Sequence, residues 1–72
     1  MALALTINGQ SRTFEELNSP AILEKLLERL GLKADRVAVE LNGEIAPRGR
    51  WAEIPIASGD RLEVVHFVGG GS

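Results

Sequence analysis

Three consecutive glycines, Gly69, Gly70 and Gly71, stand near the C-terminus and are followed by Ser72. Glycine has no Cβ, so such a run can enter a channel too narrow for other residues. Its reactive group is the terminal carboxylate. Fixing each backbone unit costs about 1–2 kcal/mol of entropy, and glycines bury no apolar surface to offset that cost. We therefore predict a flexible tail over residues 69–72 that a partner protein takes up.

The other side chains are not arranged as in an enzyme. A catalytic site needs a nucleophile beside a base, paired carboxylates, or metal ligands at a suitable spacing. His66 is the single histidine, and the serines have no histidine or aspartate at an informative distance along the chain. Gly69–Gly71 lack the lysine and following helix of a phosphate-binding loop. We expect no catalytic residue, no metal site and no cofactor held by the chain itself.

Composition narrows the class of protein further. The 72 residues make one small domain, and folding buries roughly 60% of the surface of a chain this short. There is no cysteine, which excludes disulfides and thiolate metal sites and fits a reducing compartment. The net charge is −2, with no basic run that could neutralise phosphates. Residues 1–5 lack signal-peptide features, and no stretch approaches the roughly 20 apolar residues that span a bilayer. We expect a cytoplasmic protein that binds neither nucleic acid nor membranes.

The first Asn-Gly pair predicts a β-hairpin. Before Asn8-Gly9, apolar residues alternate with small or polar ones, which indicates a strand with one buried face. A two-residue turn brings residues 10–14 back antiparallel, with Phe14 opposite Leu3. The same register puts Arg12 opposite a buried position, so a bulge or a longer turn stays open.

A helix is predicted from Pro20 to Leu30. Ser19 resembles an N-cap followed by proline at the first helical position, and Gly31 supplies a left-handed stop. The apolar stripe of this helix consists of Ile22, Leu23, Leu26, Leu27 and Leu30.

The C-terminal half repeats the hairpin pattern. Asn42-Gly43 joins an alternating strand over 36–41 to a short return over 44–46, which the following proline confines to a sheet edge. We predict an irregular segment over 48–58 with Trp51 in the core. A final strand then covers 61–68, because it is rich in β-branched and aromatic residues.

These elements define an α+β fold in which one main helix packs on one face of a mixed sheet of four to five strands. The first and last strands are expected to be parallel neighbours at the centre, as in the β-grasp, or ubiquitin-like, architecture. We place this domain over residues 1–68 and the tail over 69–72.

The final strand also predicts a docking surface. Leu62 and Val64 point to one face, and Val65 and Phe67 point to the other, which a single helix cannot cover as well. Contiguous exposed apolar side chains usually mark an interaction site. The alternative is that the loop around Trp51 folds over Val65 and Phe67.

Nearly the whole chain resembles the small sulfur carrier proteins of thiamine (thiazole) biosynthesis. The resemblance rests on three blocks, which are Thr6–Gly9, Val37–Arg48 with Trp51, and Gly59–Gly71. It implies a β-grasp fold whose C-terminal glycine an E1-like activating enzyme adenylates with ATP. A sulfur-donating enzyme then supplies the sulfur of a thiocarboxylate, which is delivered to thiazole synthase.

Carried onto this chain, the resemblance makes Gly71 the reacting residue, with Gly69 and Gly70 threading the partner's channel. Ser72 departs from the family pattern, which ends at glycine: Ser72 is removed, belongs to a fused or engineered chain, or blocks activation. Alternative functions are a carrier for molybdopterin synthesis, a protein-conjugating modifier, and an interaction module that never uses its C-terminus.

Overall fold

Short strands and helices follow one another along residues 2–67, the part of the chain that the computed structural model describes. The expected boundary between a domain over 1–68 and a tail over 69–72 lies outside the described residues. The elements are β1 (Ala2–Ile7), β2 (Gln10–Asn18), β3 (Ala21–Ile22), the helix α1 (Leu23–Arg29), the 3₁₀ helix η1 (Ala34–Arg36), β4 (Val37–Leu41), β5 (Glu44–Ala46), the 3₁₀ helix η2 (Arg48–Glu53), β6 (Pro55–Ile56) and β7 (Arg61–His66).

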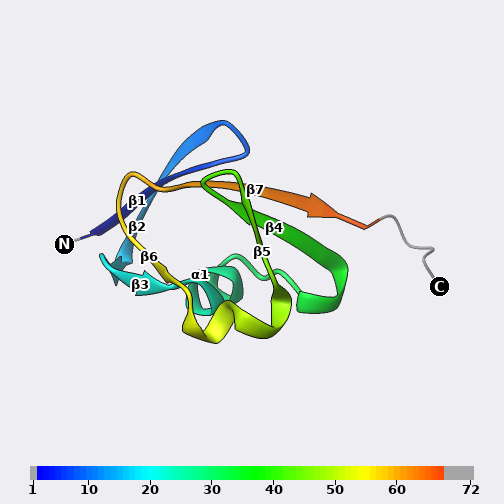
Figure 1. The fold of residues 1–72 in the computed structure, drawn as a ribbon. Helices are drawn as coiled ribbons and strands as arrows, with labels where there is room; N and C mark the ends of the chain where they lie inside the picture. The colour runs from blue at the N-terminus through cyan, green and yellow to red at the C-terminus, as the bar shows by residue number, and fades with distance from the viewer. Residues whose placement is uncertain (1, 68–72) are drawn as a thin grey trace.

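The main sheet has five strands in the order β2-β1-β7-β4-β5, and α1 lies across one of its faces (Figure 1). β1 and β7 are parallel neighbours at the centre, and the other neighbouring strands are antiparallel. This mixed sheet with one main helix confirms the predicted α+β, ubiquitin-like β-grasp fold. A separate two-stranded sheet, β3 with β6, was not predicted.

The first hairpin has the register that a two-residue turn predicts. Phe14 lies opposite Leu3, and Arg12 opposite Leu5. The Arg12 side chain is exposed and stays outside the core, with its guanidinium carbon over the Phe14 ring at 5.4 Å from the ring centre. The register shifts only at the far end of the hairpin, between Ala2 and Leu3. The predicted end of the second strand at Phe14 was wrong, since β2 continues to Asn18.

The predicted start of the helix was also wrong. Ile22 belongs to β3 and is exposed, and α1 begins only at Leu23, whose N–H donates to the carbonyl of Ile54 (2.8 Å). Pairing with β6 uses the backbone that a helix starting at Pro20 would need. Ser19 does not cap the helix, because its hydroxyl accepts the N–H of Ser58 (3.0 Å).

The C-terminal end of the helix agrees with the prediction. Gly31 has φ +76°, and its N–H donates to the carbonyl of Glu28. The N–H of Leu32 reaches back to the carbonyl of Leu27, which completes a Schellman motif. The helix therefore ends beside a residue whose positive φ favours glycine.

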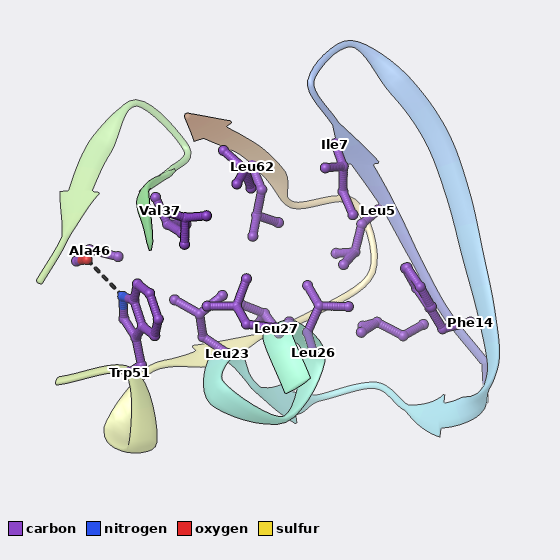
Figure 2. Packing of buried hydrophobic residues seen from close by; sticks show 14 residues of the cluster. Leu5, Ile7, Phe14, Leu23, Leu26, Leu27, Val37, Ala46, Trp51 and Leu62 are labelled. Atoms are coloured by element: carbon purple, nitrogen blue, oxygen red, sulfur yellow. Dashed lines mark hydrogen bonds between the residues drawn. The ribbon is translucent and has the colours of Figure 1, made fainter. Parts of the chain in front are cut away.

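The segment 48–58 is more regular than predicted, since it contains η2 and β6. Trp51 is buried as expected, and its indole N–H donates to the carbonyl of Ala46 (2.8 Å). Figure 2 shows this bond at the edge of the core, which lies between α1 and the sheet. The largest fully buried side chains are Leu3, Leu23, Leu26, Leu27, Val39, Ile56 and Leu62.

Candidate functional site

β7 is the element that leads into the glycine segment, and it is bonded on both sides. The N–H of Thr6 donates to the carbonyl of Asp60, and the N–H of Asn8 donates to the carbonyl of Leu62 (2.9 Å). From the β4 side, the N–H of Phe67 donates to the carbonyl of Arg36 (2.9 Å). The chain is thus held in an extended form up to the last described residue.

The predicted reactive residue, Gly71, and the predicted threading residues, Gly69 and Gly70, lie outside residues 2–67, as does Val68. The structure describes the strand that precedes them, β7, which is the central strand of the sheet. The C-terminal end of β7 lies at the edge of the fold, away from the N-terminal end of β1 (Figure 1).

Side chains of β7 alternate between the two faces of the sheet as predicted. Leu62 and Val64 are buried in the core, whereas Val65 is 60% exposed and Phe67, just after β7, is 55% exposed. The loop around Trp51 does not fold over them, because both side chains stay more than half exposed. The structure therefore brings Val65 and Phe67 to the face without the helix.

A third large apolar side chain joins this face and was missed in the sequence. Ile45 is 76% exposed, and it pairs across the strands with Glu40. The register of the Asn42-Gly43 hairpin was the signal, because it assigns Ile45 to the same face as Glu40 and therefore to the face of Val65. We call Ile45, Val65 and Phe67 the apolar patch.

A hollow of about 310 Å³ adjoins the apolar patch. Its walls include Phe67 and Ile45 from the patch, Ala38 from β4, and Pro47 and Arg48 from the start of η2. Arg48 also donates to the carbonyl of Ala34 (3.5 Å). The patch is thus continuous with a shallow, mainly apolar depression that carries a cation on its rim.

Charged residues border the patch at its other end. Glu40 and Glu63 lie directly opposite each other on β4 and β7, and Arg61 is nearby on the same face. Among residues 2–67, neither glutamate forms an ion pair within 4.0 Å. Both carboxylates stay available to solvent or to a partner.

No arrangement typical of catalysis is found among residues 2–67. Histidine and acidic side chains there do not gather in a group of three or more that could hold a metal ion. Ser58 is committed to the fold, because its hydroxyl accepts the N–H of Ala4 (3.1 Å). His66 is an exposed residue at the end of β7. Within the same range, no helix is long and apolar enough to cross a membrane.

Comparison with known proteins gives a consistent family assignment. The model of the ThiS family matches residues 5–71. The chain is 34% identical over 67 residues to the sulfur carrier protein ThiS of Bacillus subtilis, covering 93% of this chain and 98% of that protein. The crystal structure of the thiamine biosynthesis protein (ThiS) from Geobacter metallireducens superposes with a TM-score of 0.82 at 34% identity, covering 96% of this chain and 100% of that one.

A thiazole synthase from Paramagnetospirillum magneticum is 43% identical over 70 residues, which is 97% of this chain but 21% of that protein. The chain thus spans about a fifth of the length of the thiazole synthases that it matches. Since the family match covers nearly all of the sequence and the Bacillus relative is matched over nearly its full length, the chain belongs to the ThiS family.

Proposed function

We propose that this chain is a sulfur carrier for thiazole formation in thiamine biosynthesis, with the sulfur held as a thiocarboxylate on Gly71. The observation that carries the proposal is the family match over residues 5–71, which includes the whole glycine run. The central position of β7 supports it, because a partner that grips the sheet would receive the tail in a defined direction. The absence of cysteine fits a cytoplasmic setting for this chemistry.

The chain would be a substrate and carrier rather than an enzyme. A carboxylate resists nucleophilic attack, so its oxygen must first attack the α-phosphate of ATP and expel pyrophosphate. Sulfide released by a sulfur-donating enzyme then attacks the acyl carbon, AMP leaves with that oxygen, and the product is the thiocarboxylate. Both steps need groups that an E1-like adenylating enzyme would provide. The chain itself would contribute a docking surface and Gly71, which must carry the free carboxylate and therefore must no longer be followed by Ser72.

The apolar patch is the docking surface that we propose. Val65 and Phe67 are exposed on the same face, close to the start of the glycine run, and Ile45 extends the surface across β4. A partner that covers this patch would hold the base of the tail while the tail enters its active site. Apolar side chains exposed together in this way are typical of interaction sites.

Thiazole synthase is the proposed recipient of the sulfur. Relatives named thiazole synthase contain a stretch similar to nearly all of this chain. This favours thiazole formation over the two other uses of an activated glycine end, which are molybdopterin synthesis and conjugation to proteins.

The test is intact-mass analysis after incubation with an E1-like adenylating enzyme, ATP and a sulfur donor. We expect the chain ending at Gly71 to gain the mass difference between sulfur and oxygen, and then to lose it on addition of thiazole synthase and its other substrates. The same chain with Gly71→Ala is the control, and it should react slowly or not at all.

The full chain with Ser72 sharpens this test. One extra residue moves the carboxylate by roughly 3.3–3.6 Å, whereas a misplacement of about 1 Å can already cost on the order of 100-fold in rate. We expect the form with Ser72 to remain unmodified. Equal conversion of both forms would show that a terminal glycine is not what the enzyme recognises. Failure of both forms with every adenylating enzyme tried would support the interaction module instead.

A further inference from the structure

Two asparagine side chains hold β7 from opposite sides. Asn8 and Asn42 each begin an Asn-Gly turn, and they have nearly the same backbone conformation, with φ of 51° and 52°. The Asn42 side-chain oxygen accepts the N–H of Arg61 (2.9 Å), and its amide donates to Asp60 Oδ1 (3.1 Å). Asn42 therefore fixes the beginning of β7.

Asn8 fixes β7 nearer its C-terminal end. Its Oδ1 accepts the N–H of Val64 (2.7 Å), and its Nδ2 donates to the carbonyl of the same residue (3.2 Å). Both bonds are partly buried, so water competes for them less than it does at Asn42. One side chain thus satisfies both backbone groups of Val64.

This arrangement continues a strand ladder with a side chain. β1 pairs with β7 only through Thr6 with Arg61 and Ile7 with Leu62, and its chain turns away at Asn8. The backbone N–H of Asn8 still reaches Leu62 (2.9 Å), and its carboxamide then reaches two residues farther along β7. Without that carboxamide, the β1 side of β7 would have no partner beyond Leu62 among the described bonds.

The bonds between Asn8 and Val64 matter because of where Val64 lies in β7. Beyond it β7 continues away from the β1–β2 hairpin, held on the β4 side by the bond between Phe67 and Arg36 (Figure 1). The first glycine of the run follows Phe67 by two residues. Val64 is therefore the last described position at which β7 is held from both sides.

We propose that Asn8 is a positioning residue for the activation of the C-terminus. Acting through Val64, its carboxamide fixes the direction in which the tail leaves the sheet, and thereby places the terminal carboxylate in the adenylating site. This inference rests on the proposed function. It assigns no such role to Asn42, whose bonds act at the other end of the same strand.

The test compares Asn8→Gly with Asn42→Gly. Glycine tolerates positive φ, so each change removes a carboxamide without straining the turn. In Asn8→Gly we expect hydrogen exchange of the Val64 amide to accelerate by up to about tenfold beyond the change in global stability, as loss of one hydrogen bond allows. In Asn42→Gly the exchange of Val64 should follow global stability alone.

Adenylation kinetics give the readout that a purely structural role would not move. Both variants are measured below their melting transitions in the chain that ends at Gly71, because the form with Ser72 is expected to remain unmodified. For Asn8→Gly we expect kcat to fall on the order of tenfold or more, because a displaced tail is misplaced in the active site. KM should stay within about twofold, since the apolar patch that sets docking is intact. For Asn42→Gly we expect both constants to stay within about threefold.

Asn8→Asp is the conservative variant, and Asn42→Asp is its control. The carboxylate introduced by Asn8→Asp would keep the acceptor for the Val64 N–H and lose the donor, so kcat should recover in part; this pair also decides the question if Asn8→Gly does not fold. Equal losses of kcat at the two positions, or an Asn8 effect confined to KM, would overturn the inference while leaving the proposed function intact. An unmodified wild-type chain ending at Gly71 would instead overturn the proposed function.

Discussion

The two faces of the sheet along β7 carry similar apolar side chains, but one face is buried and the other is exposed. Leu62 and Val64 are 1% and 9% exposed, whereas Val65 of the same strand and Phe67, just after its end, are more than half exposed. The difference lies in the position of α1, which covers only one face of the sheet. Hydrophobicity alone therefore did not decide which residues form the core.

The comparison separates residues that stabilise the fold from residues available to a partner. The covered face continues through Trp51 and Ile56 into one connected core. The apolar patch on the open face adds little to that core and is placed beside the base of the tail. If this separation holds, substitutions on the covered face should lower the free energy of unfolding, whereas substitutions on the open face should weaken binding to a partner.

The largest effect should come from the covered face. Leu62→Ala removes a fully buried side chain between the sheet and α1, and we expect the free energy of unfolding to fall by about 2–5 kcal/mol. Urea denaturation followed by circular dichroism measures it. A loss below about 1 kcal/mol would mean that this face is not the core that the packing indicates.

Trp51 should have a smaller effect at the edge of the same face. Trp51→Phe keeps an aromatic ring but removes the donor to the carbonyl of Ala46, and we expect a loss of about 1–3 kcal/mol. Circular dichroism is again suitable, since the variant lacks tryptophan fluorescence. If stability did not change, the bond to Ala46 would contribute nothing beyond what water provides.

Phe67→Asp should change stability by no more than about 0.5 kcal/mol, because this side chain lies on the open face. Its binding to the adenylating enzyme should nevertheless weaken by about tenfold or more, as expected for an apolar contact at the centre of an interface. Isothermal titration calorimetry measures this. Thr13→Asp, which adds the same charge on the exposed strand β2, is the control and should bind like the wild type. A large fall in stability would instead make Phe67 part of the core.

The smallest effect should come from an exposed ion pair outside both faces of β7. A hydrogen bond with its own backbone and a hydrogen bond from Arg29 lower the pKa of Glu16 below its ordinary value. Since the pKa is lowered by folding, the ionised form stabilises the fold at neutral pH, and this contribution is lost as the pH falls through the folded-state pKa. Thermal melts of the wild type and Glu16→Gln should therefore differ slightly at pH 7 and converge in acid. A difference that persists in acid would show that Glu16 acts through something other than its charge.

The sequence determined by itself those features that depend on neighbouring residues. Asn8-Gly9 and Asn42-Gly43 specify tight turns, and alternation then assigns each side chain of a hairpin to a face. This is why the pairing of Leu3 with Phe14 and the exposure of Val65 and Phe67 could be predicted. The stop at Gly31 is local as well, because it needs only a residue that accepts positive φ.

Only the tertiary structure decided the features that join distant segments. Ser19-Pro20 has the local pattern of a helix start, but pairing of Ala21 and Ile22 with β6 delays the helix until Leu23. The bond between Asn8 and Val64 joins residues 56 positions apart, and an Asn-Gly pair looks the same in sequence whether or not its amide reaches another strand. Local patterns fix the conformation of a segment, whereas the partners of its polar groups depend on which segments the packed core brings together.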